Sequence, residues 1–318
     1  MNRFASWAVC LLAASGLAWA QPYPNKPVRV IFPFAAGGAG DIIARAYGQK
    51  FTERFGQNWV LDNRGGAGST LGTDIAAKAT PDGYTLLQAS LTFAVSAATY
   101  TKLPYDPVRD FIPITPLAVA VSILAVTPSL PAGSVKELVA LAKAKPGQLT
   151  FASAGTGSTG HLSGELFKRM TGIDMVHVPY KGSGPALPDL LAGRVHMIFE
   201  PAATMLPHVR AGRMRALGVT SAKRSAAAPE IPSLAEQGLE GYDVATWYGL
   251  LAPARTPRRV IETLHRAFAE FAASAEIRER MSAIAVEPMS LSPDEYARLI
   301  KRDIARWSEV ARAAGVSL

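Results

Sequence analysis

Two glycine-rich segments contain the residues whose types and spacing are best suited to binding a small anion. The first covers residues 34–41 and the second residues 153–161, and each lies between an apolar run typical of a strand and a longer helical pattern. Glycine lets the backbone come close to a ligand. The first turn of a helix has N–H groups without internal acceptors and carries a partial positive charge. These segments therefore favour a carboxylate or a phosphate, although either one alone is also typical of a tight turn.

Side chains within the two segments can add hydrogen bonds to those of the backbone. Ser158 and Thr159 offer hydroxyls to a ligand or cap the following helix, and Asp41 is a typical N-cap residue. His161, on the first turn of its helix, suits a ligand contact, a packed position or a capping role equally well. From the two segments we expect ligand contacts from Phe34, Ala36, Gly37, Gly38, Gly40, Asp41, Ser153, Thr156, Gly157, Ser158, Thr159, Gly160 and His161.

Further polar residues follow predicted strands, at the edge where open α/β sheets bind ligands. Ser90, Tyr180 and Glu200 each lie within two residues of the end of such a strand, and we expect them to line the same site, although strand ends also carry ordinary turn formers. Lys181 would favour an anion. Glu200 would discourage a second carboxylate, or would accept a hydrogen bond from an amine, a hydroxyl or a ring N–H.

A dinucleotide site is one alternative for the second segment. Gly155, Gly157 and Gly160 match G-x-G-x-x-G between a predicted strand and a helix. The acidic residue that binds the ribose should end the next strand. That strand ends at residues 178–181 without an acid, and Asp174 lies before the strand. The pattern therefore disfavours a nicotinamide cofactor, and we expect no cofactor.

An exported hydrolase is the alternative that competes with a binding function. Ser158 and His161 could act as nucleophile and base if their side chains met and a third group oriented the base. The sequence has no G-x-S-x-G elbow. The five histidines show no H-x-x-x-H spacing and no clustering with carboxylates, so we expect no metal site.

The pattern along the chain predicts how these residues are positioned. Short apolar runs alternate with longer helical ones, which predicts parallel strands with crossover helices. Capping-box signals begin two helices, at Ser134 with Glu137 and at Ser292 with Glu295. Pro257 indicates the start of a helix that ends near residue 273. Strands are expected over 28–32, 59–61, 84–89, 122–126, 149–152, 175–178, 197–199 and 216–220, and helices over 41–55, 69–79, 134–144 and 161–171.

Residues 1–20 have the order of a secretory signal peptide. Arg3 is followed by an uncharged run over 7–19, and Ala18 and Ala20 supply the small residues for cleavage after Ala20. Cys10 is the only cysteine, so we expect no disulfide in the mature chain. The formal net charge is +8, but the basic residues are dispersed, and we expect no nucleic-acid partner.

The chain resembles the Bug, or TctC-like, substrate-binding proteins of tripartite tricarboxylate transporters. Nearly the whole mature chain shares the family's ordered motifs. They are FPFAAGG at 32–38, DNRGGAG at 62–68, PDGYTL at 81–86, GTGSTGH at 155–161, PYKG at 179–182 and TWYG at 246–249.

This resemblance implies an α/β periplasmic-binding-protein fold, type II-like, in which two α/β lobes enclose a ligand cleft. We expect one lobe to comprise residues 21–120 and 248–318 and the other residues 121–247, with chain crossings near 118–122 and 244–250. In the family both glycine-rich loops hold a ligand carboxylate through backbone N–H groups, hydroxyls and bridging water.

The resemblance also implies a function. The expected role is that of a periplasmic, monomeric, non-enzymatic solute-binding protein that delivers a small carboxylate to the membrane subunits of a transporter. Some members also signal to a sensor kinase. Two departures leave the ligand's identity open: Gly40 stands where many relatives carry threonine, and Glu200 stands where aspartate is common.

Overall fold

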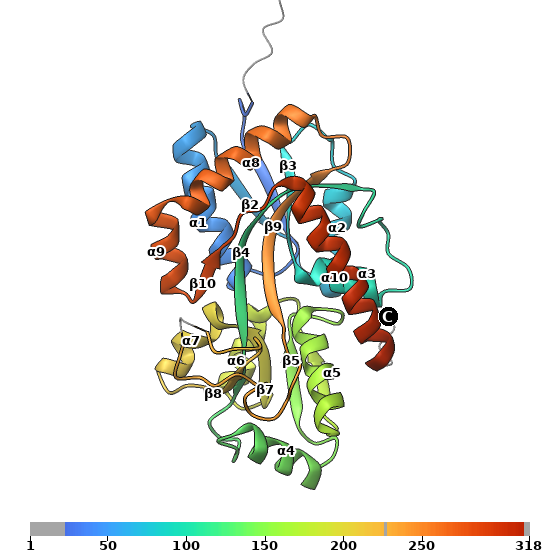
Figure 1. Cartoon of the computed structure of the whole chain (residues 1–318), viewed down its shortest axis with the longest axis vertical. Helices are drawn as coiled ribbons and strands as arrows, with labels where there is room; N and C mark the ends of the chain where they lie inside the picture. Colours follow the sequence, from blue (N-terminus) through green and yellow to red (C-terminus); the bar gives the residue numbers. More distant parts are fainter. Residues whose placement is uncertain (1–22, 226–227, 315–318) are drawn as a thin grey trace, which may run out of the picture.

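The computed structural model describes residues 23–225 and 228–314 of the 318-residue chain. Its two α/β lobes lie one above the other in Figure 1, joined by the long strands β4 (Phe111–Val126) and β9 (Ala245–Pro253). The expected signal peptide, with its cleavage after Ala20, lies outside the described residues. The expected α/β periplasmic-binding-protein architecture with two lobes is confirmed.

The first lobe is built on a mixed sheet. Strands β1 and β2 are parallel, as are β1 and β3, while β9 runs antiparallel to β3 and to β4, so the order is β2-β1-β3-β9-β4. A short strand, β10, pairs with β4. The elements of this lobe besides β4 and β9 are β1 (Val28–Phe32), β2 (Trp59–Asn63), β3 (Thr85–Ser90), β10 (Val286–Pro288), the 3-10 turn η1 (Ala67–Ser69) and the helices α1 (Ala39–Phe55), α2 (Thr70–Ala77), α3 (Leu91–Thr99), α8 (Arg258–Ala273), α9 (Ala275–Ala283) and α10 (Pro293–Ala314).

The second lobe continues from the far half of β4. That half pairs antiparallel with β7 and with β8, and β5 lies parallel to both β7 and β6. The elements of this lobe are β5 (Thr150–Ser153), β6 (Val176–Pro179), β7 (Met197–Pro201), β8 (Arg215–Val219) and the helices α4 (Val135–Ala144), α5 (Thr159–Thr171), α6 (Ser183–Leu191) and α7 (Ala202–Arg210).

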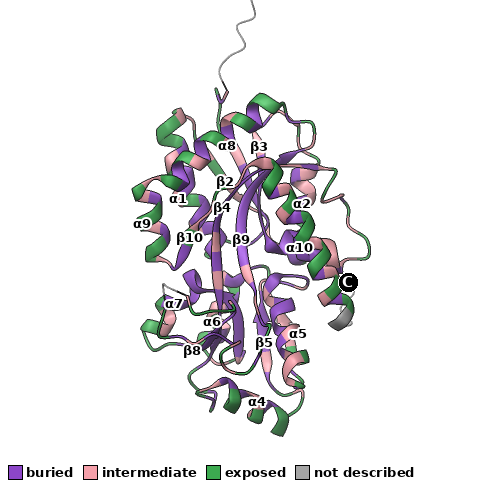
Figure 2. Cartoon of the chain, in the orientation of Figure 1, coloured by how far each residue is buried: buried purple, intermediate pink, exposed green. Residues whose placement is uncertain are grey.

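Strand β4 changes its partners where the chain passes from one lobe to the other. Residues 111–121 lie opposite β9, whereas Ser122 and the residues after it lie opposite β7. On β9, Ala245 lies opposite Val121. Figure 2 shows both strands largely buried along the middle of the molecule. The lobe limits at 120/121 and 247/248 remain predictions, and this change of partner is close to them.

Buried apolar residues explain why the elements pack as they do. In the first lobe Tyr47 and Phe51 of α1 meet Phe268 of α8, with Trp59 of β2 against the same rings. Removing such side chains from water is the main stabilising contribution to the fold. The spacing of buried apolar residues along α1, such as Ile43, Tyr47 and Phe51, therefore determines which face of the helix packs inward.

The capping box at Ser292 is confirmed, whereas the one at Ser134 forms only in part, because the Glu137 carboxylate accepts from the Gly133 N–H instead of the Ser134 N–H. The Glu137 N–H donates to Ser134 Oγ at 3.2 Å at the start of α4. Ser292 and Glu295 bond reciprocally, with the Ser292 N–H donating to Glu295 Oε2 at 2.9 Å and the Glu295 N–H donating to Ser292 Oγ at 3.3 Å. Pro257 is the N-cap of α8, because its ψ of 135° is extended, so the helix begins at Arg258, one residue later than expected.

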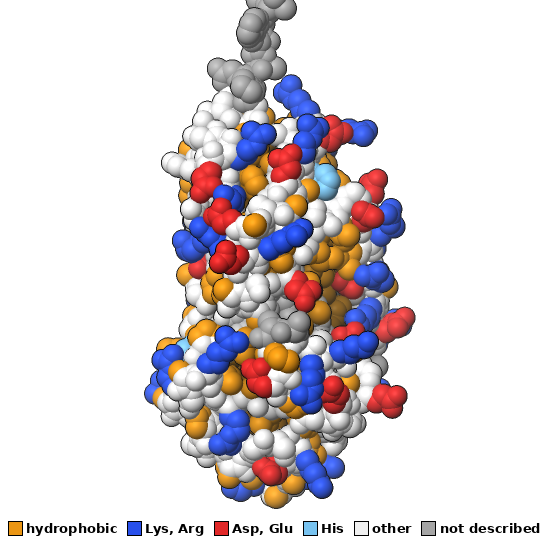
Figure 3. Space-filling model, turned by 60° about the vertical axis from the view of Figure 1, so that its left-hand side comes forward, with side chains coloured by type: hydrophobic (Ala, Val, Ile, Leu, Met, Phe, Trp, Pro, Cys, Tyr) orange, Lys and Arg blue, Asp and Glu red, His pale blue; other side chains and the backbone are white. Residues whose placement is uncertain are grey.

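The surface carries charges of both signs. On the face in Figure 3, Lys and Arg side chains are interspersed with Asp and Glu side chains over both lobes. Within residues 23–225 and 228–314, no helix combines the length and the apolar character needed to cross a membrane.

Candidate ligand-binding site

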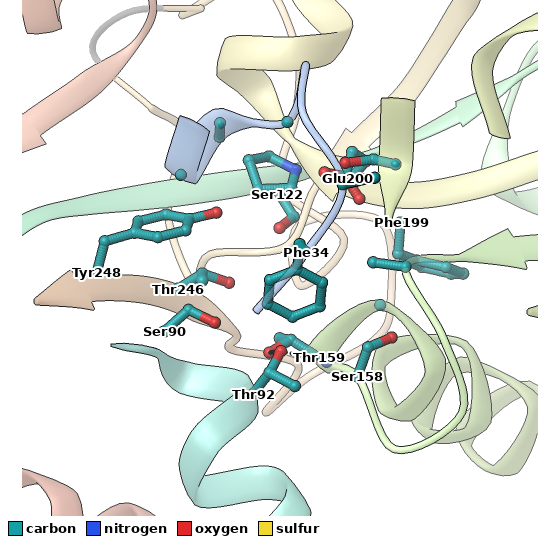
Figure 4. Close-up of a pocket in the computed structure, with 18 of the residues that line it drawn as sticks. Phe34, Ser90, Thr92, Ser122, Ser158, Thr159, Phe199, Glu200, Thr246 and Tyr248 are labelled. Atoms are coloured by element: carbon teal, nitrogen blue, oxygen red, sulfur yellow. Dashed lines mark hydrogen bonds between the residues drawn. The ribbon is translucent and has the colours of Figure 1, made fainter. Parts of the chain in front are cut away.

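A small pocket lies where the two lobes meet. Its volume is about 50 Å³, and its walls come from the ends of β1, β3, β7 and β9 and from the first turns of α1 and α5 (Figure 4). The residues that line it are Phe32, Phe34, Ala35, Gly38, Ala39, Gly40, Ser90, Thr92, Ser122, Ala154, Ser158, Thr159, Gly160, Ser183, Phe199, Glu200, Pro201, Thr246 and Tyr248.

The first glycine-rich segment brings the start of α1 to the pocket wall. Gly38 is the N-cap residue, and its carbonyl accepts hydrogen bonds from the N–H groups of Asp41 at 3.0 Å and Ile42 at 3.2 Å. The N–H groups of Ala39 and Gly40 come earlier in the helix and have no intrahelical acceptor. Both residues line the pocket, so this helix end offers backbone donors and a partial positive charge to a ligand.

The second segment brings the start of α5 to the same pocket from the other lobe. Ser158 is the N-cap residue, and its Oγ accepts from the His161 N–H at 3.3 Å. The Thr159 N–H donates to Thr92 Oγ1 at 3.1 Å. The Gly160 N–H is then the donor of this first turn that lacks an intrahelical acceptor. Two helix N-termini from two lobes therefore meet at one small cavity.

Hydrogen bonds join the lobes around the pocket. The hydroxyls of Thr92 and Thr159 lie 3.0 Å apart, and the Ala35 N–H donates to the Lys181 carbonyl at 3.0 Å. The Tyr100 hydroxyl lies 3.0 Å from the Ala67 carbonyl of its own lobe and 3.3 Å from the Thr156 carbonyl of the other. These contacts hold the lobes closed. In this arrangement the pocket, of about 50 Å³, has room for only a few water-sized spheres.

Two glycines are needed because their neighbours are so close. A Cβ atom on Gly40 would lie 2.4 Å from Phe32 Cζ and 3.0 Å from Tyr248 Cε1. A Cβ atom on Gly160 would lie 2.8 Å from the Phe199 carbonyl oxygen. Both contacts are much shorter than ordinary carbon contacts, so any side chain here would displace the pocket wall.

Glu200 is the only Asp, Glu, Lys, Arg or His among the described residues that line the pocket. It is the penultimate residue of β7 and is 6% exposed. Burial raises the pKa of its carboxyl to about 7, although a hydrogen bond from Ser183 acts in the opposite direction. Tyr248 faces the same region, and burial together with the charge of Glu200 raises its pKa well above the usual value. The Tyr248 hydroxyl therefore stays protonated and can donate a hydrogen bond.

Half of the sixteen predicted site residues line this pocket. They are Phe34, Gly38, Gly40, Ser90, Ser158, Thr159, Gly160 and Glu200. Figure 4 shows Ser90 and Thr92 together with Ser158 and Thr159 on one side of the Phe34 ring, and Glu200 on the other. The structure places the remaining eight outside the pocket wall: Ala36, Gly37, Asp41, Ser153, Thr156, Gly157, His161 and Tyr180.

Asp41 supports the first segment from behind. Its carboxylate accepts from Arg45 at 3.0 and 3.1 Å and from Asn63 Nδ2 at 3.1 Å. The Gly37 N–H reaches the same carboxylate at 3.4 Å. Ala36 and Gly37 are exposed. The prediction that Asp41 is the N-cap is therefore wrong: Gly38 is the N-cap of α1, and Asp41 lies in the first turn, where its side chain fixes the approach to the helix.

The second segment rests on a pair of stacked histidines. His161 and His177 have ring centroids 4.0 Å apart, and Ser153 Oγ lies 2.6 Å from His177 Nε2. The Gly157 N–H donates to His161 Nδ1 at 3.1 Å. Burial lowers the pKa of His161 to about 4 and that of His177 to about 3, so both rings are neutral at pH 7. His177, which the sequence analysis did not select, thus helps to hold the segment.

The same bonds bear on the hydrolase alternative. The Ser158 hydroxyl accepts a hydrogen bond from the backbone N–H of His161, and Nδ1 of the His161 ring accepts one from the Gly157 N–H. The side chains of Ser158 and His161 therefore do not form a nucleophile–base pair in this geometry. Three or more His, Cys, Asp or Glu side chains do not come together as a metal site anywhere in the described part of the chain.

Thr156 and Tyr180 line a separate surface hollow together with Lys181. The Tyr180 hydroxyl donates to Asp189 Oδ2 at 2.6 Å, so it is already engaged within the second lobe. Lys181 is exposed, and its contribution to the lobe contact is its backbone carbonyl.

Several lining residues were not selected from the sequence. Phe32 and Phe199 lie at strand positions that read as ordinary core, and Thr246 and Tyr248 lie in a motif that carried no assigned role. Ser122 is on the strand that passes between the lobes, and Ser183 begins α6. Ser90 and Glu200 were selected because they directly follow predicted strands. Ser183 begins a helix instead, so only the contact between the lobes shows that it lines the pocket.

A family model described as "Tripartite tricarboxylate transporter family receptor" matches residues 43–316. BugT of Bordetella pertussis is 36% identical over 323 residues, which cover 100% of this chain and 99% of BugT. The solved structure of R. palustris Rpa4515 with adipate has a TM-score of 0.90 at 38% identity, covering 93% of this chain and 99% of that one. MatC from Rhodopseudomonas palustris with bound malate has a TM-score of 0.87 at 30% identity, covering 91% of this chain and 99% of MatC.

Proposed function

Because the chain belongs to the tripartite tricarboxylate transporter receptor family, we propose that it captures a small carboxylate outside the cytoplasm and delivers it to the membrane subunits of such a transporter. The proposal includes a periplasmic location, which agrees with the signal-peptide pattern of residues 1–20. It treats the chain as a binding protein and not as an enzyme.

The observation that carries this proposal is the meeting of two helix N-termini at one pocket. The N–H groups of Ala39 and Gly40 on α1 and of Gly160 on α5 lie in its wall without intrahelical acceptors. Hydroxyls of Ser90, Thr92 and Ser158 surround them. Backbone donors at a helix N-terminus bind anions without needing a basic side chain, and a carboxylate fits this set.

Delivery requires that the ligand enters and leaves. We propose that the lobes rotate about the crossings near 118–122 and 244–250, which include the point where β4 changes partners. The contacts of Thr92 with Thr159 and of Ala35 with Lys181 would form on closure and break on opening. Relatives determined with adipate and with malate support carboxylates as the ligand class.

A thermal-shift screen of the mature protein against a broad carboxylate panel tests the proposal. A ligand that binds only the folded protein raises its melting temperature by an amount that grows with concentration. We expect at least one acid to do so and to be recovered unchanged after incubation. A panel without any shift would contradict the binding function, and conversion of an acid into a product would favour the hydrolase.

A further inference from the structure

The pocket contains an acid and no base. Among the described residues that line it, Glu200 is the only one with a carboxyl group, and none carries an ammonium, guanidinium or imidazole group. A single ligand carboxylate can be held by the backbone N–H groups of α1 and α5. A second carboxylate of the ligand would find no cationic side chain among the described residues of this wall. Burying a charged group without such a partner carries a large free-energy cost.

The small size of the pocket makes Glu200 hard for a ligand to avoid. The cavity measures about 50 Å³, and Glu200 lies in its wall together with Ser122 and Ser183 (Figure 4). A polar ligand group that lies away from the helix ends therefore meets a described pocket wall in which Glu200 is the only carboxyl. Like charges that are held together in a water-poor site repel strongly, whereas a hydroxyl or an amine can donate to the carboxylate.

The rest of the wall suits a ligand with a short apolar middle. Phe32, Phe34 and Phe199 supply aromatic surface between the polar groups. Ser183 and Tyr248 accompany Glu200, and each offers one hydroxyl. A ligand group that faces this trio meets one ionisable acceptor and two hydroxyls.

We propose that Glu200 makes this site select a monocarboxylate that also carries a hydrogen-bond donor, such as a hydroxyl or an amine, against dicarboxylates. This selectivity rests on the carboxylate-binding function proposed above. The ligand class it predicts differs from the dicarboxylates adipate and malate that the structures of Rpa4515 and MatC contain.

Matched pairs of acids test the proposal directly. Isothermal titration calorimetry at pH 8.5 compares 4-hydroxybutyrate with succinate and 6-hydroxyhexanoate with adipate, so that only the distal group differs within a pair. The hydroxy acid of the pair that binds should bind at least about tenfold more tightly, because the dicarboxylate places like charges together. Equal or tighter binding of the dicarboxylate would overturn the proposal.

Two variants test whether the preference for hydroxy acids over dicarboxylates comes from the Glu200 carboxylate. Glu200→Gln keeps the size of the side chain but removes its charge, and it should reduce the preference to within about threefold. Glu200→Asp keeps the charge and should retain a preference. An unchanged preference in a Glu200→Gln protein with a native circular-dichroism spectrum would overturn the proposal.

A pH series on the unmodified protein gives a second route if Glu200→Gln fails to fold. Glu200 takes up a proton below about pH 7, so the preference should shrink between pH 8.5 and pH 5.5. Among the described residues of the pocket wall, Tyr248 on β9 is the other titratable group, and its raised pKa keeps it neutral throughout this range. A preference that stays constant across this range would overturn the proposal.

The outcomes separate this proposal from the function on which it rests. If the acids bind but show no preference, the selectivity fails and carboxylate capture stands. If neither these four acids nor any acid of the broad carboxylate panel gives heat or a thermal shift, carboxylate capture by this pocket fails, and the selectivity fails with it.

Discussion

The hydroxyls of Thr92 and Thr159 lie 3.0 Å apart and connect the start of α3 in the first lobe with the start of α5 in the second. Thr92 Oγ1 also accepts the Thr159 N–H at 3.1 Å. Both residues line the pocket, so the contact that closes the lobes is part of the wall that would surround a ligand. Closure and binding are therefore expected to depend on the same side chains.

Thr159→Val should weaken carboxylate binding by about two- to tenfold, because it removes one neutral hydrogen bond from the closed state while keeping the shape of the side chain. Titration calorimetry with an acid from the panel measures the effect. Thr99→Val is the matched control, since the Thr99 hydroxyl donates to the Val95 carbonyl within α3, outside the pocket. Equal affinities of the Thr159 and Thr99 variants would contradict a role for the lobe contact in binding.

Gly40→Ala should abolish measurable binding and lower stability by about 1–3 kcal/mol, because its Cβ would overlap the Phe32 ring beside the Ala39 and Gly40 N–H groups. Calorimetric titration and urea unfolding measure the two effects separately. Ala36→Ser, at an exposed position of the same segment, is the control and should bind normally. Wild-type affinity in a folded Gly40→Ala protein would remove this helix end from the site.

A bulky residue in place of Gly38 should also abolish binding. The added Cβ would lie 2.9 Å from Ser183 Oγ, across the contact between the two lobes, so the variant should remain folded but close poorly. Small-angle scattering of the Gly38→Leu protein with an added acid should show no compaction, whereas the unmodified protein should become more compact. Compaction of both proteins would argue against this prediction.

The His161–His177 stack should make the fold sensitive to acid. Both pKa values are lowered by burial, to about 4 and about 3, below the value of about 6.5 that unfolded histidine has. The unfolded state therefore binds more protons, and the stabilising contribution present above pH 6.5 is lost as pH falls toward 4. His177→Asn should flatten this part of the melting-temperature profile, whereas His265→Asn on α8 should not. Parallel profiles for the two variants would contradict the assignment.

Trp247 anchors α10 to the strand that crosses between the lobes. Its Nε1 donates to Asp303 Oδ2 at 2.7 Å, and burial raises the pKa of Asp303. Trp247→Phe leaves that buried carboxyl without its donor and should cost about 1–3 kcal/mol in urea unfolding. Asp303→Asn keeps an acceptor for the indole and should cost less. The reverse order of the two losses would be inconsistent with this contact.

Local signals located one of the two helix ends well. Ser158 is the N-cap of α5, as its hydroxyl leads one to expect, because capping depends on a few adjacent residues. The sequence predicts Asp41 as the cap of α1, but Gly38 is the N-cap and Asp41 lies in the first turn. Strand ends likewise led to Ser90 and Glu200, which both line the pocket. Ser158, Ser90 and Glu200 depend on chemistry within one turn or one strand end, which the sequence records directly.

The residues that sequence reasoning missed depend on contacts between distant segments. Ser183 and Tyr248 reach the pocket only because the start of α6 and strand β9, which are far apart in the sequence, border the same cavity. Strand β4 was expected only over 122–126 and runs from Phe111, since Pro113 and Pro116 disguise its first part. The register shifts next to both prolines, which is how a sheet accommodates a residue without an N–H donor.

In the proposed function, the N-termini of α1 and α5 bind the same ligand carboxylate. A crystal structure of the mature protein with an acid from the titration panel measures this most directly. We predict the carboxylate oxygens within hydrogen-bond distance of the Gly40 and Gly160 N–H groups, directly or through one water, with the remaining polar group toward Glu200. A carboxylate bound elsewhere, or bound here without contact to either helix end, would contradict the account.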